Sequence, residues 1–133
     1  MIPLRDTIPS KSFPIVTWFI IIVNAIVFVF EFLFLNDVQT EALIYKYGLV
    51  PDQIRFYYVS TIADIRTVLI RPFFTNMFLH GGWGHIISNM WILFIFGDNV
   101  EDRMGKIRYF IFYILCGIVA GLTHFVLYRN SSV

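Results

Sequence analysis

The sequence has little charge and almost no cysteine. Only 14% of its 133 residues are charged and 58% are hydrophobic, whereas soluble globular domains carry about 25% charged residues. Ten basic residues against nine acidic ones leave no positive excess to neutralise nucleic-acid phosphates. The single cysteine, Cys116, excludes an intrachain disulfide and a zinc site of several thiolates. The composition therefore predicts a membrane protein that does not bind nucleic acid.

Long apolar runs indicate where the chain crosses the bilayer. The runs Ile15–Leu35 and Ile107–Tyr128 are each long enough for a hydrocarbon core of ~30 Å at a rise of ~1.5 Å per residue. The run Ile86–Phe96 is shorter, and it crosses only if the residues before it already lie below the membrane surface. We therefore expect an all-α membrane protein, a polytopic helical bundle. The expected spans are about 14–35, 85–97 and 107–128.

The connection of residues 36–84 is rich in aromatic and basic residues, which favours amphipathic segments in the membrane interface. Basic residues are denser in the N-terminal tail and in the loop 97–106 than in this long connection. By the positive-inside rule, that density predicts a cytoplasmic N-terminus. Glu31, near the end of the first run, is expected at the interface, because an unpaired carboxylate deeper in the membrane is costly.

The densest polar group at membrane depth is the segment His80–Asn89, which opens the short apolar run. His85 and Asn89 are four residues apart, so a helix projects both from one face, where both can donate hydrogen bonds to one point. His80 lies upstream in a glycine-rich turn that can reach the same place. Converging donors at the positive end of a helix suit stabilisation of an oxyanion.

Two other interpretations of these polar residues compete with the oxyanion site. Polar side chains in membranes often serve only as hydrogen bonds between helices, and the spacing alone allows that structural role equally well. A metal site is disfavoured, because no carboxylate lies nearby and the two histidines lack the spacing of helical zinc motifs. We therefore expect neither a metal nor another cofactor.

Two further groups are expected to have structural roles. Gly117 and Gly121 form a Gly-x-x-x-Gly pair that lets another helix approach closely, although the sequence does not say which helix. Glu101, Arg103 and Gly105 suit the end of a helix at the cytoplasmic surface. Gly105 is expected to adopt a left-handed cap, and the two charged side chains are expected to bond backbone ends and each other.

The segment Phe73–Gly105, FFTNMFLHGGWGHIISNMWILFIFGDNVEDRMG, closely resembles the second-span region of the rhomboid intramembrane serine proteases. It has the family's His-x-x-x-Asn element and the Gly…Val-Glu-x-Arg-x-Gly sequence that follows. The resemblance implies that His85 and Asn89 stabilise the oxyanion and that His80 supports the same site. Arg71 resembles the Trp-Arg position of the family's first loop, although isoleucine replaces the tryptophan.

The resemblance also implies a single partial rhomboid domain over residues 1–133, with the first three of six spans and an interfacial first loop. The family's nucleophilic serine belongs to a Gly-x-Ser-Gly motif of a fourth span and its histidine base to a sixth, and this sequence contains neither. His124 does not match the position of that base. We therefore expect the N-terminal part of the enzyme, lacking the C-terminal spans of the same protein and inactive as a chain of 133 residues.

In the complete protein, the resemblance implies a serine endopeptidase that hydrolyses peptide bonds in or near the transmembrane segments of membrane-protein substrates. The opening residues look like those of bacterial members, which implies a bacterial inner membrane. Two alternatives stay open. One is a catalytically inactive rhomboid-like protein that binds transmembrane helices, and the other is a small three-span structural protein.

Overall fold

A computed structural model describes residues 11–50 and 70–128 of the chain. Within these ranges the secondary structure is entirely helical, which confirms the prediction of an all-α membrane fold. The helices α1 and α7 are long and apolar enough to cross a membrane. The described helices are α1 (Ile15–Phe34), α2 (Asp37–Tyr47), α5 (Arg71–Thr75), α6 (Trp83–Met104) and α7 (Lys106–Leu127).

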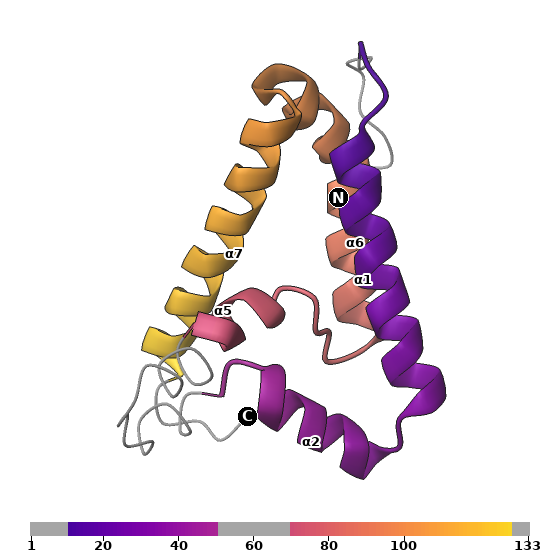
Figure 1. Cartoon of the computed structure of the whole chain (residues 1–133), viewed down its shortest axis with the longest axis vertical. Coiled ribbons are helices and arrows are strands. Elements are labelled where there is room, and N and C mark those ends of the chain that lie inside the picture. Colours follow the sequence, from indigo (N-terminus) through magenta and orange to yellow (C-terminus); the bar gives the residue numbers. More distant parts are fainter. Residues whose placement is uncertain (1–10, 51–69, 129–133) are drawn as a thin grey trace.

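The three long helices form an open wedge (Figure 1). Helices α1 and α6 lie side by side, whereas α7 diverges from α6 after the turn at Gly105. That glycine ends α6 and begins α7 with φ 79° and ψ 153°. The positive φ requires glycine, but the extended ψ differs from the left-handed helical cap that was predicted. The short helices α2 and α5 run across the opposite end of the wedge (Figure 1).

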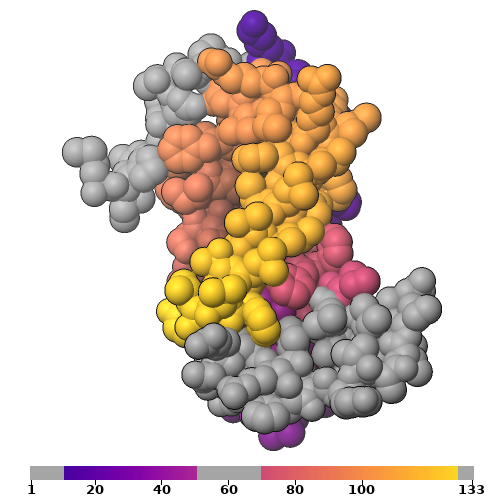
Figure 2. Space-filling view, turned by 90° about the vertical axis from the view of Figure 1, so that its left-hand side faces the viewer, coloured from indigo at the N-terminus to yellow at the C-terminus, as the bar shows by residue number. Residues whose placement is uncertain are grey.

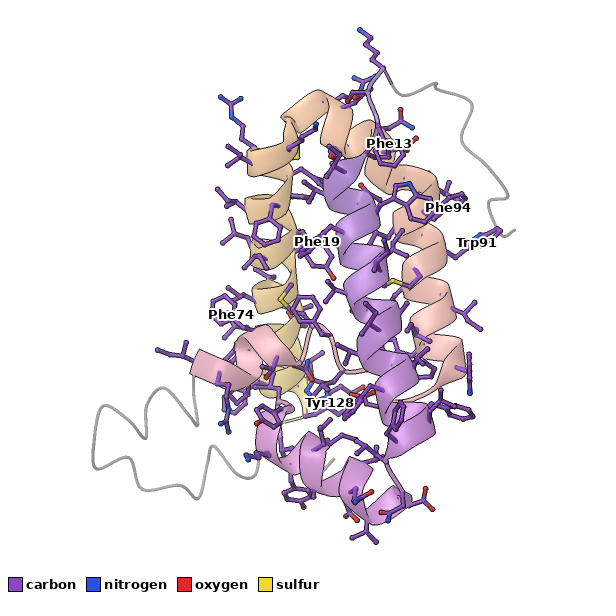
Figure 3. The ribbon with its side chains drawn as sticks, turned by 45° about the vertical axis from the view of Figure 1, so that its right-hand side comes forward. Phe13, Phe19, Phe74, Trp91, Phe94 and Tyr128 are labelled. Atoms are coloured by element: carbon purple, nitrogen blue, oxygen red, sulfur yellow. The ribbon has the colours of Figure 1, made fainter. Side chains whose placement is uncertain are left out.

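The polar interruptions of the first apolar run lie on its buried face. Thr17, Asn24 and Glu31 are spaced by seven residues, so they share one side of α1 with Ile20 and Phe28. This side packs against α6, which makes more contacts with α1 than any other described helix does. The remaining faces of α1 are apolar and exposed, as a helix surrounded by lipid requires. On α6, Trp91 and Phe94 also point outward (Figure 3).

Glu101 joins the end of α6 to the beginning of α1. Its carboxylate accepts hydrogen bonds from the backbone N–H of Val16 at 3.0 Å, the backbone N–H of Thr17 at 2.9 Å and the Thr17 hydroxyl at 2.9 Å. Helix α1 has no side-chain cap of its own and no acidic residue in its first turn. The carboxylate therefore satisfies free N–H groups and stabilises the positive end of the helix.

These contacts correct one expectation about the end of α6. Glu101 caps a different helix instead of bonding its own helix end, and in the described part of the chain no ion pair joins it to the exposed Arg103. Helix α6 itself runs from Trp83 to Met104 and contains the segment 85–97 that was predicted to span the membrane. The polar last turns stay helical because tertiary contacts to α1 hold them.

Gly97 lets α1, α6 and α7 meet closely near this cap. A Cβ atom on Gly97 would lie 2.7 Å from Thr17 Cγ2 and 2.9 Å from Tyr109 Oη. The Thr17 hydroxyl also lies at 3.3 Å from the Tyr109 hydroxyl, within hydrogen-bond distance. The closed end of the wedge is therefore a compact junction of three helices, and only glycine fits at its centre.

Glu31 lies deeper in the protein than expected. It is 8% exposed, on the same buried face as Phe28, and its Oε1 has no hydrogen-bond partner in the described residues. Phe28 and Phe32 both pack edge-on against Trp83, with ring centroids 4.9 and 5.2 Å away. These rings pack at the end of α1 where Glu31 lies, and Glu31 itself is buried against the protein, which its position in the sequence did not predict.

Candidate functional site

The polar segment lies where α6 begins, at the open end of the wedge. His80 precedes the helix and is 8% exposed, whereas His85 and Asn89 stand on its first turns and are exposed. The rings of His80 and His85 meet edge-on, with centroids 5.1 Å apart. The structure therefore brings the two histidines together and places Asn89 one turn further along the helix.

A pocket of about 400 Å³ opens between α6 and α7. His80 and Asn89 both line it; His85 is not a lining residue, but its ring contacts His80. The other lining residues are mostly apolar, and sequence reasoning did not single them out. They are Met77, Met90, Ile92, Leu93, Phe96, Gly97, Val100, Tyr109, Phe112, Tyr113 and Cys116.

The environment of His80 favours its neutral form. Burial lowers the pKa of His80 below the ordinary 6.5, the hydrogen bond to the Phe78 carbonyl opposes that shift, and the nearby His85 adds to it. The Nδ1 atom lies 3.3 Å from that carbonyl oxygen. Because a carbonyl only accepts hydrogen bonds, Nδ1 carries the proton, and Nε2 is left with a lone pair in the neutral ring. His80 is thus suited to accept a hydrogen bond from a neighbouring donor.

Arg71 fixes α5 to the end of α2. Its Nη2 donates to the Lys46 carbonyl, and its guanidinium carbon lies 4.8 Å from the centroid of the Tyr47 ring. Thr75 adds a hydrogen bond from its hydroxyl to the Tyr47 carbonyl. The segment before His80 is therefore anchored to the first loop, so the structure gives Arg71 contacts within that loop and none with the pocket.

Gly117 and Gly121 face α5 and the end of α2. A Cβ atom on Gly117 would lie 2.7 Å from Met77 Cγ and closer still to the end of that side chain. A Cβ atom on Gly121 would lie 3.1 Å from Phe73 Cδ1 and 3.3 Å from Leu49 Cδ2. Figure 2 shows α5 against the surface of α7. The close partner that the sequence left open is thus the segment of the first loop before His80.

His124 lies on the same side of α7, one turn beyond Gly121. It is half-buried, its ring stacks on Tyr128 at 5.0 Å, and its Nδ1 has no hydrogen-bond partner among the described residues. It does not line the pocket. In the described ranges, no group of three or more His, Cys, Asp or Glu side chains is arranged to hold a metal ion.

Comparison with known proteins adds a family to this geometry. The rhomboid domain matches residues 67–133, just over half of the chain, which includes α5, the polar segment, α6 and α7. The chain belongs to the rhomboid family, and it is a membrane protein.

One curated relative gives the extent of the similarity. Rhomboid-like protein 11, chloroplastic, of Arabidopsis thaliana is 38% identical over 61 residues. The aligned residues cover 46% of this chain and 22% of the relative, so the chain corresponds to under a quarter of that protein. No solved structure matches the chain.

Proposed function

We propose that this chain supplies the oxyanion-stabilising part of an intramembrane serine endopeptidase. The observation that carries the proposal is the grouping of His80, His85 and Asn89 at the start of α6, beside a pocket. Hydrolysis of a peptide bond through an acyl-enzyme passes through a tetrahedral intermediate with a negative oxygen. Hydrogen-bond donors fixed around that oxygen stabilise it, and removal of one donor typically costs ~10²–10³ in rate.

Each polar side chain has a distinct role in the proposal. Asn89 donates from its side-chain amide, and His85 donates from a ring N–H. His80, neutral and bound to the Phe78 carbonyl, orients the His85 ring through their edge-on contact. The positive end of α6 adds to the favourable field. This chemistry requires no metal and no cofactor.

The serine nucleophile and its histidine base are proposed to come from C-terminal spans of the same protein. The sequence of 133 residues contains no Gly-x-Ser-Gly motif. His124 does not match the position of the family's base, and its ring stacks on Tyr128. Without a base within hydrogen-bond reach, a serine hydroxyl is a weak nucleophile. The chain alone is therefore expected to be inactive.

The proposed substrates are transmembrane proteins cleaved in or near their spans, in a bilayer with the N-terminus of this chain in the cytoplasm. The bacterial inner membrane stays a prediction from the resemblance, and the curated relative is a plant protein with a chloroplastic name. A reporter that is active only in the cytoplasm, fused before Lys11, tests the orientation. Activity of the same reporter when fused after Tyr128 and not before Lys11 would contradict it.

The catalytic proposal is tested by extending the chain with the last three spans of an active rhomboid protease. Cleavage of a transmembrane substrate is then measured in a host without rhomboids. The extended protein is expected to cleave, the chain alone is not, and His85→Ala or Asn89→Ala should each lower the rate by ~10²–10³. Ser88→Ala is the matched control, because the Ser88 hydroxyl donates within its own helix, to the His85 carbonyl.

A catalytically inactive protein that binds transmembrane helices is the alternative. It predicts that the folded extended protein retains the substrate helix on purification but does not cleave it. Full cleavage by His85→Ala and Asn89→Ala variants would contradict the oxyanion role of these residues.

A further inference from the structure

We infer that Gly117 and Gly121 are positioning residues, which set the place of His80 by fixing the depth at which α5 and Met77 pack on α7. The inference rests on the proposed function, because it assigns a purpose to the position of His80. Neither glycine lines the pocket, so both act through the segment between α5 and α6.

The contact between the glycines and this segment leaves no room for a side chain. The space beside Gly117 is filled by Met77, and the space beside Gly121 is filled by Phe73 and Leu49. Helix α7 is otherwise largely exposed, and at Gly117 and Gly121 it comes close to Met77 and Phe73. A side chain as large as leucine here would displace the flexible end of Met77 and press on Phe73 in α5, and we expect this to move the segment away from α7.

A displacement of this segment would also move His80, which follows it closely in the chain. Met77 and His80 line the same pocket and are three positions apart in the chain. Met77 lies in a turn that is closed by the Phe78 N–H, which donates to the Thr75 carbonyl at 3.0 Å. The Phe78 carbonyl in turn holds the ring of His80. A shift of Met77 therefore moves the group that orients His80.

The other side of α5 is also anchored, so the helix cannot yield by rotating. The hydrogen bonds from Arg71 and Thr75 to the carbonyls of Lys46 and Tyr47 hold it on the end of α2. Contacts with α2 on one side and with α7 on the other therefore fix the position of α5. The small residues of α7 determine how closely α5 packs against that helix.

The test uses the whole chain in lipid nanodiscs, with its histidines labelled with ¹⁵N. The three ring signals are assigned with His80→Gln, His85→Gln and His124→Gln variants and followed by NMR through a pH titration. Gly121→Leu is expected to shift the His80 signals and to raise the titration midpoint of His80 toward 6.5, because the displaced segment exposes the ring. Ala120→Leu is the matched control, because Ala120 is an exposed small residue of the same helix.

Two further variants distinguish positioning from a general loss of folding. Gly117→Leu should shift the His80 signals in the same way, and a second change, Met77→Ala, should reverse much of that shift because it returns space beside residue 117. If Gly121→Leu does not fold, Gly121→Ala replaces it, with a smaller shift expected in the same direction. Unchanged His80 signals in folded glycine variants, or equal shifts in Ala120→Leu, would overturn the inference.

The active extended protein gives a separate readout. There Gly121→Leu is expected to lower kcat at least tenfold with little change in KM, since the variant disturbs the support of the oxyanion and not the apolar wall of the pocket. If the unmodified extended protein does not cleave at all, the proposed function fails, while the NMR signals of His80 still decide whether the glycines position it.

Discussion

Replacement of Glu101 by glutamine tests how the closed end of the wedge is held together. The carboxylate is 2% exposed and accepts two backbone N–H bonds and one hydroxyl bond from the first turn of α1. Glutamine has almost the same shape, but only one of its two end atoms accepts hydrogen bonds. Its amide group would face an N–H donor, so at least one bond is lost and one buried N–H is left without a partner.

The expected cost follows from these losses. A hydrogen bond to a charged group contributes about 1.5–3 kcal/mol, and a buried donor without a partner costs about 1–3 kcal/mol. The negative charge beside the N-terminus of α1 adds up to about 2 kcal/mol. Because these contributions overlap, Glu101→Gln is expected to destabilise the fold by about 2–4 kcal/mol. Alanine would leave all three donors without the carboxylate and should cost more.

The assay is reversible unfolding in mixed micelles, followed by circular dichroism. Glu41→Gln on the exposed side of α2 is the control, and it should leave the midpoint unchanged. The double variant Thr17→Val/Glu101→Gln should lose less stability than the sum of the two single variants, because the two residues share a hydrogen bond. A free energy of unfolding for Glu101→Gln within about 0.5 kcal/mol of that of the unmodified chain would refute the capping argument, since surface substitutions without a structural role have effects of this size.

Three further predictions use the same unfolding assay. Gly97→Val should cost about 1–3 kcal/mol by overpacking, whereas Gly84→Ala should be far milder because nothing lies within 4 Å of its Cβ position. Because the pKa of His80 is lowered in the folded state, stability should be full above pH 6.5 and fall on acidification below it, and His80→Gln should weaken that fall. Arg71→Lys keeps the charge but loses the planar group that stacks on Tyr47, so it should lower stability by about 1 kcal/mol, and an unchanged midpoint would contradict that contact.

The elements that the sequence predicted best are those whose signal is local. The apolar runs that form α1 and α7 are long enough to be recognised from the sequence alone, and glycine at position 105 predicts the end of a helix there. The polar segment His80–Asn89 was also identifiable, because hydrogen-bonding groups are rare at membrane depth. Each of these signals depends on neighbouring residues in the chain and on little else.

The features that sequence reasoning missed depend on partners far away in the chain. The last turns of α6 are polar, and they stay helical because Glu101 reaches α1. Glu31 is buried on the face of α1 that it shares with Phe28, a burial that its place near the end of the apolar run did not reveal. A spacing of seven between the polar residues of α1 was the available signal for a shared buried face, and it was not used.

The two ends of the wedge differ in whether their buried polar atoms have hydrogen-bond partners. At the closed end, the buried carboxylate of Glu101 accepts three hydrogen bonds, as a structural site requires. Glu31 Oε1, Arg71 Nε and His124 Nδ1, toward the open end, and Asn24 Oδ1, midway along α1, are buried without hydrogen-bond partners in the described residues. Because such groups are costly at membrane depth, they are expected where further protein groups or water complete a site. The proposed oxyanion site lies at this same end, so the fold is closed by satisfied hydrogen bonds at one end and carries most of its unpartnered buried polar atoms toward the other.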